Sequence, residues 1–163
     1  FVLYLTVFPT RYIRFLMAEV LFTKSPALTW LLCKLGGIYV DRDARDFSFM
    51  AESIKTLESG GTVGIFPQSR LPVNGCRWPF KPSIVFIALR SGAPIVPVYT
   101  DGQYGIFKRT RIMIGEAVDL RSLCSSRNPD DAEISRLTKL LEDKVYALGA
   151  RLDEIRKEET KCR

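Results

Sequence analysis

The 163-residue sequence contains no histidine, and this absence excludes much of the chemistry expected of a small enzyme domain. Histidine is the usual general base near neutral pH and a common zinc ligand. The cysteines are far apart in the sequence and lack the close pairs of zinc sites; they are Cys33, Cys76, Cys124 and Cys162. We therefore expect no structural zinc, no bound cofactor, and free thiols in a reducing compartment.

The sequence also lacks a long apolar run. Residues 1–8 form an apolar segment that is much shorter than the roughly 20 residues of a membrane-spanning helix. No charged leader of the kind found in signal peptides accompanies it. Low-complexity segments and repeats are absent too, and 47% of the residues are hydrophobic, as in a globular domain. We expect any membrane contact to be peripheral, or to be made by sequence upstream of residue 1.

Basic residues, in contrast, are in excess. The chain has 24 Lys and Arg against 18 Asp and Glu, a net charge of +6. This charge fits an anionic partner such as phosphate groups, an anionic lipid surface or nucleic acid, and it also fits a solvated surface. Lys108, Arg109 and Arg111 form a basic cluster, but no nucleic-acid-binding motif accompanies them. We therefore expect no nucleic acid partner.

A first candidate for membrane contact is the segment 1–22 with its flanking basic residues. Its apolar side chains could insert into a membrane while the basic ones meet anionic head groups, or they could simply be core residues. The residues concerned are Phe15, Leu16, Val20, Leu21 and Phe22, flanked by Arg11, Arg14 and Lys24.

Hydrophobic residues alternate between strand spacing and helix spacing along the chain. The pattern predicts strands at residues 12–17, 37–40, 62–66 and 94–99, and one or two more within 106–118. Helices are predicted at residues 27–35, 46–57 and 82–90, and a long amphipathic helix at 131–156. This alternation is typical of an α/β domain with a largely parallel, twisted sheet flanked by helices. We expect one domain over residues 1–163, with the long helix on the sheet rather than in a coiled coil.

Three of the predicted strands carry unusual residues, two of them just after the carboxyl end of the strand. Open α/β sheets bind their ligands at these ends. Arg42 follows the strand at 37–40, and Arg70 follows the strand at 62–66 after a Phe-Pro turn. The strand at 94–99 contains a proline that suits an edge or a bulge. Two guanidinium groups at neighbouring strand ends can form a fork for a phosphate monoester. They can equally pair with nearby carboxylates, and spacing alone leaves both interpretations open.

Three segments in order resemble sequence blocks of the 1-acylglycerol-3-phosphate (lysophosphatidate) acyltransferase family of glycerolipid acyltransferases. Gly-Ile-Tyr-Val-Asp-Arg at 37–42 is similar to the second block, whose arginine binds glycerol phosphate. Phe-Pro-Gln-Ser-Arg at 66–70 is similar to the third block, and Val-Pro-Val at 96–98 to the fourth. The resemblance covers nearly the whole chain. It implies that the substrate-binding residues are Arg42, Gln68, Ser69, Arg70 and Lys81.

The sequence departs from the family pattern in the third block and lacks the first. Gln68 stands where the family has glutamate, and it keeps an acceptor oxygen but loses the charge. Ser69 stands where the family has glycine, and it adds a side chain where close approach of the backbone to a ligand favours none. Either change would alter the acyl acceptor or impair the enzyme. The first block, His-x4-Asp, is absent, and we expect it within a few residues upstream of Phe1.

The resemblance implies acyl transfer from acyl-CoA or an acyl carrier protein to the free hydroxyl of a lysophosphatidate-type glycerol phosphate, in phospholipid synthesis. In the family, the histidine is the general base, the aspartate orients it, and no covalent enzyme intermediate forms. We expect the parent protein to act at the cytoplasmic face of a membrane, held peripherally or anchored by upstream sequence. The 163 residues alone should be inactive. The alternative is a non-catalytic module of the same fold that binds phospholipid or phosphate.

Overall fold

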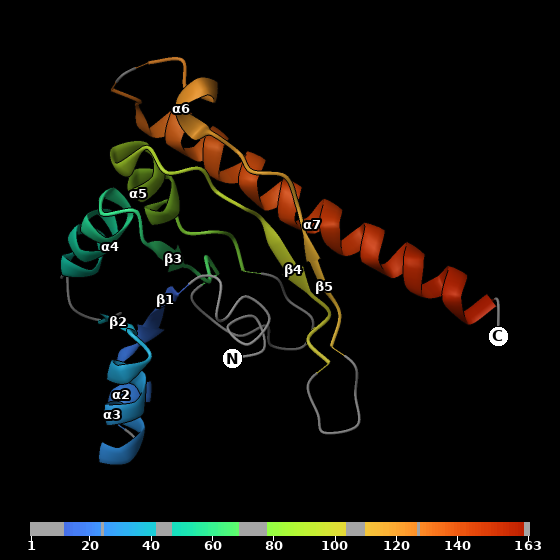
Figure 1. Ribbon diagram of the computed structural model, residues 1–163. Coiled ribbons are helices and arrows are strands. Elements are labelled where there is room, and N and C mark those ends of the chain that lie inside the picture. The colour runs from blue at the N-terminus through green and yellow to red at the C-terminus, as the bar shows by residue number, and fades with distance from the viewer. Residues whose placement is uncertain are drawn as a thin grey trace. The chain divides into compact units, whose positions relative to one another are not determined.

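The structure, a computed structural model, describes residues 12–23, 25–41, 47–68, 78–103, 110–126 and 128–161 (Figure 1). The chain divides into two compact units, Phe1–Ala93 and Pro94–Arg163. The first contains a parallel sheet with helices, and the second contains an antiparallel strand pair and a long helix. This architecture confirms the predicted α/β class, with a parallel sheet flanked by helices and a long terminal helix. The expectation of a single domain stays a prediction.

A parallel sheet with the strand order β2-β1-β3 forms the centre of the first unit. Its strands are β1 (Ile13–Ala18), β2 (Ile38–Val40) and β3 (Thr62–Gly64). β1 pairs in parallel with both of its neighbours, so that Ala18 lies opposite Val40 of β2 and Phe15 lies opposite Gly64 of β3. Ile13, Phe15 and Ile38 are buried apolar side chains of this sheet. Because all three strands run the same way, their carboxyl ends meet at one edge.

Helices connect and cover these strands (Figure 1). They are α2 (Glu19–Thr23), α3 (Pro26–Lys34), α4 (Ser48–Glu58) and α5 (Ser83–Ser91). α2 contacts β1, β2 and α3, whereas α4 contacts β2, β3 and α5. Pro26 and Gly92 mark the start of α3 and the end of α5 in the sequence. A proline occupies the first position of α3, and α5 ends at Gly92, which has φ 74° and whose N–H donates to the Ala88 carbonyl at 2.8 Å.

The inward face of α4 differs from the apolar stripe in the sequence. The apolar residues at helical spacing in this segment are Phe47, Met50, Ile54 and Leu57. Phe47 is nevertheless 68% exposed, whereas Ser53 and Thr56 are buried. Their hydroxyl groups donate to carbonyl groups one turn earlier in the same helix, at 2.6 Å and 2.8 Å. Burial therefore leaves neither hydroxyl without a partner. Asp46 is a suitable N-cap for this helix by residue type, but it lies outside the described residues.

The second unit consists of two antiparallel strands that pack against a long helix (Figure 1). β4 (Val98–Thr100) pairs with β5 (Ile112–Ile114), and the short α6 (Leu120–Leu123) precedes α7 (Asp131–Lys161). α7 contacts both strands. Its buried apolar side chains are Ile134, Leu137, Leu141 and Leu152. All four belong to the apolar face of the predicted amphipathic helix. The last helix packs on strands, as expected, but these strands form an antiparallel pair and are not part of the parallel sheet.

β4 is shorter than predicted because of Pro97. The predicted strand covered residues 94–99, but regular pairing begins at Val98, and Ile95 forms only an isolated bridge with Val118. Proline has no N–H to donate to a strand ladder, so the ladder is interrupted at that point. The Pro97 carbonyl still accepts a hydrogen bond from the Gly115 N–H at 2.9 Å.

Two helices were not predicted. α2 has five residues and α6 has four, which is too short for a helical repeat to appear in the sequence. α6 nevertheless carries a cap that could have been recognised, because the Asp119 carboxylate accepts a hydrogen bond from the Arg121 N–H at 2.9 Å.

Candidate functional site

At the carboxyl edge of the parallel sheet, the chain leaves the strands toward the segments predicted to bind the substrate. Asp41 follows β2, Glu19 follows β1, and residues 65–68 follow β3. The prediction that β2 and β3 are neighbours is wrong, because β1 lies between them. Adjacent strands are about 4.8 Å apart, so the ends of β2 and β3 are separated by about 10 Å across the sheet. A ligand held from both sides would therefore lie over the end of β1.

The strands of this edge end at different heights. The last residue of β3 is opposite Phe15 and the last residue of β2 is opposite Ala18, so β3 ends three residues earlier along β1. At about 3.3 Å per residue, this stagger is about 10 Å. Residues 65 and 66 continue beyond β3, and the chain turns at Pro67 and Gln68.

Aromatic packing guides the chain as it leaves β3. The Phe66 ring stacks on the Phe15 ring of β1, with 5.8 Å between the centroids and 20° between the planes. Gly64 allows this arrangement, because a β-carbon at that position would collide with the Phe15 ring. Phe66 itself is 67% exposed. The stack turns the start of the third family-like segment over β1, the central strand.

The structure brings Gln68 and Lys81 together at the base of one loop. Gln68 Nε2 donates to the Trp78 carbonyl at 3.3 Å, and the Lys81 backbone N–H donates to the Pro67 carbonyl at 2.9 Å. These two bonds join the chain on either side of residues 69–77. The Gln68 side chain is half-buried and Lys81 is exposed. The other predicted substrate-binding residues, Arg42, Ser69 and Arg70, lie outside the described residues.

Glu19 is a residue of this edge that the sequence interpretation missed. It directly follows β1, the central strand, and is half-buried. A carboxylate is an acceptor for hydrogen bonds from cationic groups. The available signal was its position just after an apolar strand-like segment, the same signal that identified Arg42.

Arg14 has a structural role in the first unit. Its guanidinium group donates to the Gly36 carbonyl at 3.1 Å, to Thr56 Oγ1 at 3.0 Å and to Glu52 Oε1 at 2.5 Å. The neighbouring Phe15 is buried in the core. Both residues were candidates for membrane contact. Phe15 is a core residue, and the Arg14 guanidinium is bonded to the turn before β2 and to α4.

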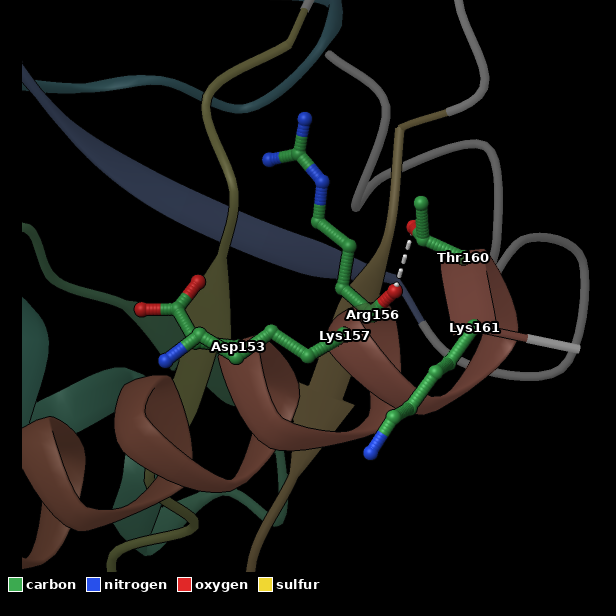
Figure 2. A pocket seen from close by; sticks show the side chains of 5 residues that line it. All are labelled: Asp153, Arg156, Lys157, Thr160 and Lys161. Atoms are coloured by element: carbon green, nitrogen blue, oxygen red, sulfur yellow. Dashed lines mark hydrogen bonds between the residues drawn. The ribbon is translucent and has the colours of Figure 1, made fainter.

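A hollow of about 600 Å³ lies along the last turns of α7 (Figure 2). The side chains that line it are Asp153, Arg156, Lys157, Thr160 and Lys161. All of them belong to exposed turns of one helix, and the Thr160 hydroxyl donates to the Arg156 carbonyl at 2.8 Å. Among the residues that the structure describes, one helix supplies the whole lining, and neither Gln68 nor Lys81 belongs to it.

Comparison with known proteins decides the family. A family model described as acyltransferase matches residues 1–101, which is more than half of the chain and includes all three family-like segments. The chain belongs to the acyltransferase family. The crystal structure of the 1-acyl-sn-glycerophosphate (LPA) acyltransferase PlsC from Thermotoga maritima has a similar fold, with a TM-score of 0.57 and 23% identity over 84% of this chain. The chain spans 57% of that protein.

These findings confirm the predicted family and fold. The matched region contains the parallel sheet and the complete carboxyl edge described above. Membership of the acyltransferase family therefore rests on the same residues as the candidate site. The roles of Arg42, Gln68, Ser69, Arg70 and Lys81 stay predictions.

Proposed function

We propose that this chain supplies the acceptor-binding part of a glycerolipid acyltransferase. The reaction is transfer of an acyl group from acyl-CoA or an acyl carrier protein to the free hydroxyl of a lysophosphatidate-type glycerol phosphate. The proposal rests on one observation in a member of the acyltransferase family, the arrangement of the chain at the carboxyl edge of the parallel sheet. Two segments that resemble family blocks, residues 37–42 and 66–70, leave the sheet on either side of β1 at the same edge.

In this proposal, Arg42 and Arg70 bind the phosphate of the acceptor. Each guanidinium can donate two parallel hydrogen bonds to a phosphate, and one approaches from each side of the sheet edge. Lys81, at the loop base, adds a third positive charge without fixed geometry. The hydrogen bonds of Gln68 and Lys81 join Gln68 and Pro67 to Trp78 and Lys81, the described residues on either side of the segment that contains Arg70.

The proposed general base lies outside the 163 residues, because they contain no histidine. In the family reaction, the base takes the proton of the acceptor hydroxyl as its oxygen attacks the thioester carbonyl. The carbon–sulfur bond of the donor then breaks, and the departing thiolate takes up a proton. The products are the diacylated acceptor and the free thiol of the carrier. We therefore expect the 163-residue chain alone to show no acyl transfer.

The proposed site of action is the cytoplasmic face of a membrane, where both the acceptor and the product reside. In the part of the chain that the structure describes, no helix is both long enough and apolar enough to cross a bilayer. The proposal therefore needs only peripheral contact by these residues. The acyl donor is the soluble partner, and no bound cofactor takes part.

The test is acyl transfer by the parent enzyme with two acceptors, one with and one without a phosphate group. Arg70→Ala should lower kcat/KM for the phosphate-bearing acceptor by a factor equivalent to roughly 2–5 kcal/mol, and should change the other acceptor much less. Arg151→Ala, at an exposed position of α7, is the matched control and should leave both rates unchanged. Equal losses with both acceptors would contradict a phosphate-binding role.

A second candidate is a non-catalytic module that binds phospholipid or phosphate. The observation that favours it is the hydrogen bond from Gln68 Nε2 to the Trp78 carbonyl. A glutamate, the residue usual in the family, has no N–H and could not donate this bond. The Gln68 side chain thus bonds to the Trp78 carbonyl. This structural role fits a module that binds its ligand without turnover. A parent protein that binds lysophosphatidate but transfers no acyl group would establish this candidate.

A further inference from the structure

α3 is apolar on its outer face as well as on its inner face. Of its described side chains only Leu32 is buried. Ala27, Trp30, Leu31 and Lys34 follow the spacing i, i+3, i+4, i+7 and so form one stripe along the helix. All four are exposed, Trp30 by 64% and Leu31 by 43%. A surface helix of a soluble protein normally carries polar residues on this face.

α2, which contacts α3, also carries exposed apolar side chains. Val20 is 56% exposed and Leu21 is 36% exposed, and no α2 side chain is buried. The two helices contact each other, and the Thr29 hydroxyl of α3 donates to the Phe22 carbonyl at the end of α2. We call residues 19–34 the α2–α3 hairpin. Its outer side presents Val20, Leu21, Trp30 and Leu31 to the surroundings.

The hairpin is attached to the rest of the first unit by contacts with Tyr39 of β2 and with Tyr12. The Phe22 ring meets the Tyr39 ring of β2 edge-on, with 5.5 Å between the centroids. The Tyr12 hydroxyl donates to the Lys34 carbonyl at the end of α3, at 3.1 Å. The hairpin is thus a fixed element that carries an apolar outer surface.

Charge indicates which partner this surface fits. Lys34 Nζ lies 5.8 Å from the centre of the Trp30 ring, so the apolar stripe ends in an aromatic ring beneath a cation. Tryptophan favours the interface of a bilayer, and lysine there reaches the lipid phosphates. The unit Phe1–Ala93 has eleven Lys and Arg against six Asp and Glu, a net charge of +5 of the total +6. This balance complements an anionic lipid surface.

A second copy of the chain fits this surface less well. A specific protein–protein interface buries about 1,200 Å² or more in total, and four partly exposed side chains contribute much less than that. Insertion into a lipid interface has no such threshold, because each apolar side chain that leaves water adds to binding. A nine-residue helix is about 14 Å long, which suits a position in the plane of the interface.

We propose that the α2–α3 hairpin inserts into the interface of an anionic membrane. Val20, Leu21, Trp30 and Leu31 enter the boundary between head groups and acyl chains, and Lys34 meets the lipid phosphates. The biological reason for this insertion rests on the proposed function, since a lipid acceptor would be taken up at the bilayer. Its geometric argument uses none of the substrate-binding residues.

The test measures binding of the 163-residue chain to phosphatidylcholine vesicles, with and without phosphatidylglycerol. The double variant Trp30→Ser/Leu31→Ser should bind anionic vesicles at least about tenfold more weakly than the wild type. Phe47→Ser removes a side chain of similar exposure outside the hairpin and should bind like the wild type. Lys34→Gln should reduce the preference for anionic vesicles. Unchanged binding of the double variant would overturn the proposal.

Fluorescence provides a readout that does not depend on these variants. The chain has two tryptophans, so Trp78→Phe leaves Trp30 as the single reporter. Its emission should shift to shorter wavelength with anionic vesicles, and brominated lipid should quench it. An unchanged spectrum would overturn the proposal, as would a concentration-dependent dimer that the double variant abolishes without any vesicle binding.

The vesicles contain no acyl acceptor, and the binding assay involves no catalysis. The test of the proposed function can use soluble short-chain acceptors without vesicles. Failure of membrane insertion and failure of acyl transfer are therefore separate results.

Discussion

At the scale of single residues, Arg14 joins three parts of the first unit. Arg14 lies in β1. Its guanidinium donates to the Gly36 carbonyl in the turn before β2 and to the side chains of Glu52 and Thr56 in α4. Arg14→Met should lower the free energy of unfolding by about 1–3 kcal/mol, because it removes three hydrogen bonds from a partly buried site. Chemical denaturation with Arg151→Met as the matched control measures this effect. A loss no larger than in the control would contradict the assigned role.

Gln68 makes a second prediction at this scale. Gln68→Glu removes the N–H that reaches the Trp78 carbonyl and restores the residue usual in the family. If Gln68 is what limits turnover, the variant should raise acyl transfer by the parent enzyme while lowering stability by about 1 kcal/mol. Gln68→Leu, which removes both the donor and the acceptor, is the control. Activity that falls equally in both variants would show that the amide supports catalysis instead.

At the scale of elements, a polar network fixes the start of α7. Glu133 accepts hydrogen bonds from the Arg136 guanidinium and from the Ser125 N–H, and Arg136 also donates to the Leu123 carbonyl at the end of α6. The Asp130 carboxylate caps the helix by accepting from the Glu133 N–H at 2.8 Å. The network therefore connects α6 to the first turn of α7.

The charge of Glu133 gives this network a pH dependence. The hydrogen bonds from Arg136 and from the Ser125 backbone lower the pKa of Glu133 from 4.5 to about 2. A lowered pKa in the folded state stabilises the fold above pH 4.5, and this contribution disappears as the pH falls from 4.5 to 2. Glu133→Gln should therefore lower Tm slightly at pH 7, and its difference from the wild type should shrink through that window. A difference that is constant with pH would contradict the ion pair.

At the scale of the whole molecule, the elements that were predicted well are those with strong local signals. The stripe of α7 repeats over many turns, and Gly92 marks the end of α5. Strand order could not be read in this way, because pairing joins residues far apart in the chain. The sequence does not indicate that β1 lies between β2 and β3. Nor does it reveal the inward face of α4, where hydroxyl groups bonded within the helix replace apolar side chains.

The candidate site was predicted mainly by its resemblance to family blocks, which place Arg42 and Arg70 after strands. The residues themselves did not distinguish a phosphate site from local ion pairs. The structure adds the shared edge, the position of Glu19 and the loop base at Gln68 and Lys81. It also shows that Arg14 serves the fold through its three hydrogen bonds. Such a distinction depends on packing, which sequence spacing does not determine.

The central claim is that the carboxyl edge of the sheet binds the phosphate of the acyl acceptor. Titration calorimetry with a soluble short-chain lysophosphatidate and the 163-residue chain tests it directly, without need of catalysis. We predict that the wild type binds, that Arg42→Ala and Arg70→Ala each weaken binding by roughly 2–5 kcal/mol, and that Arg151→Ala binds like the wild type. Equal affinity in all four proteins, or a preference for the same lipid without its phosphate, would contradict the claim.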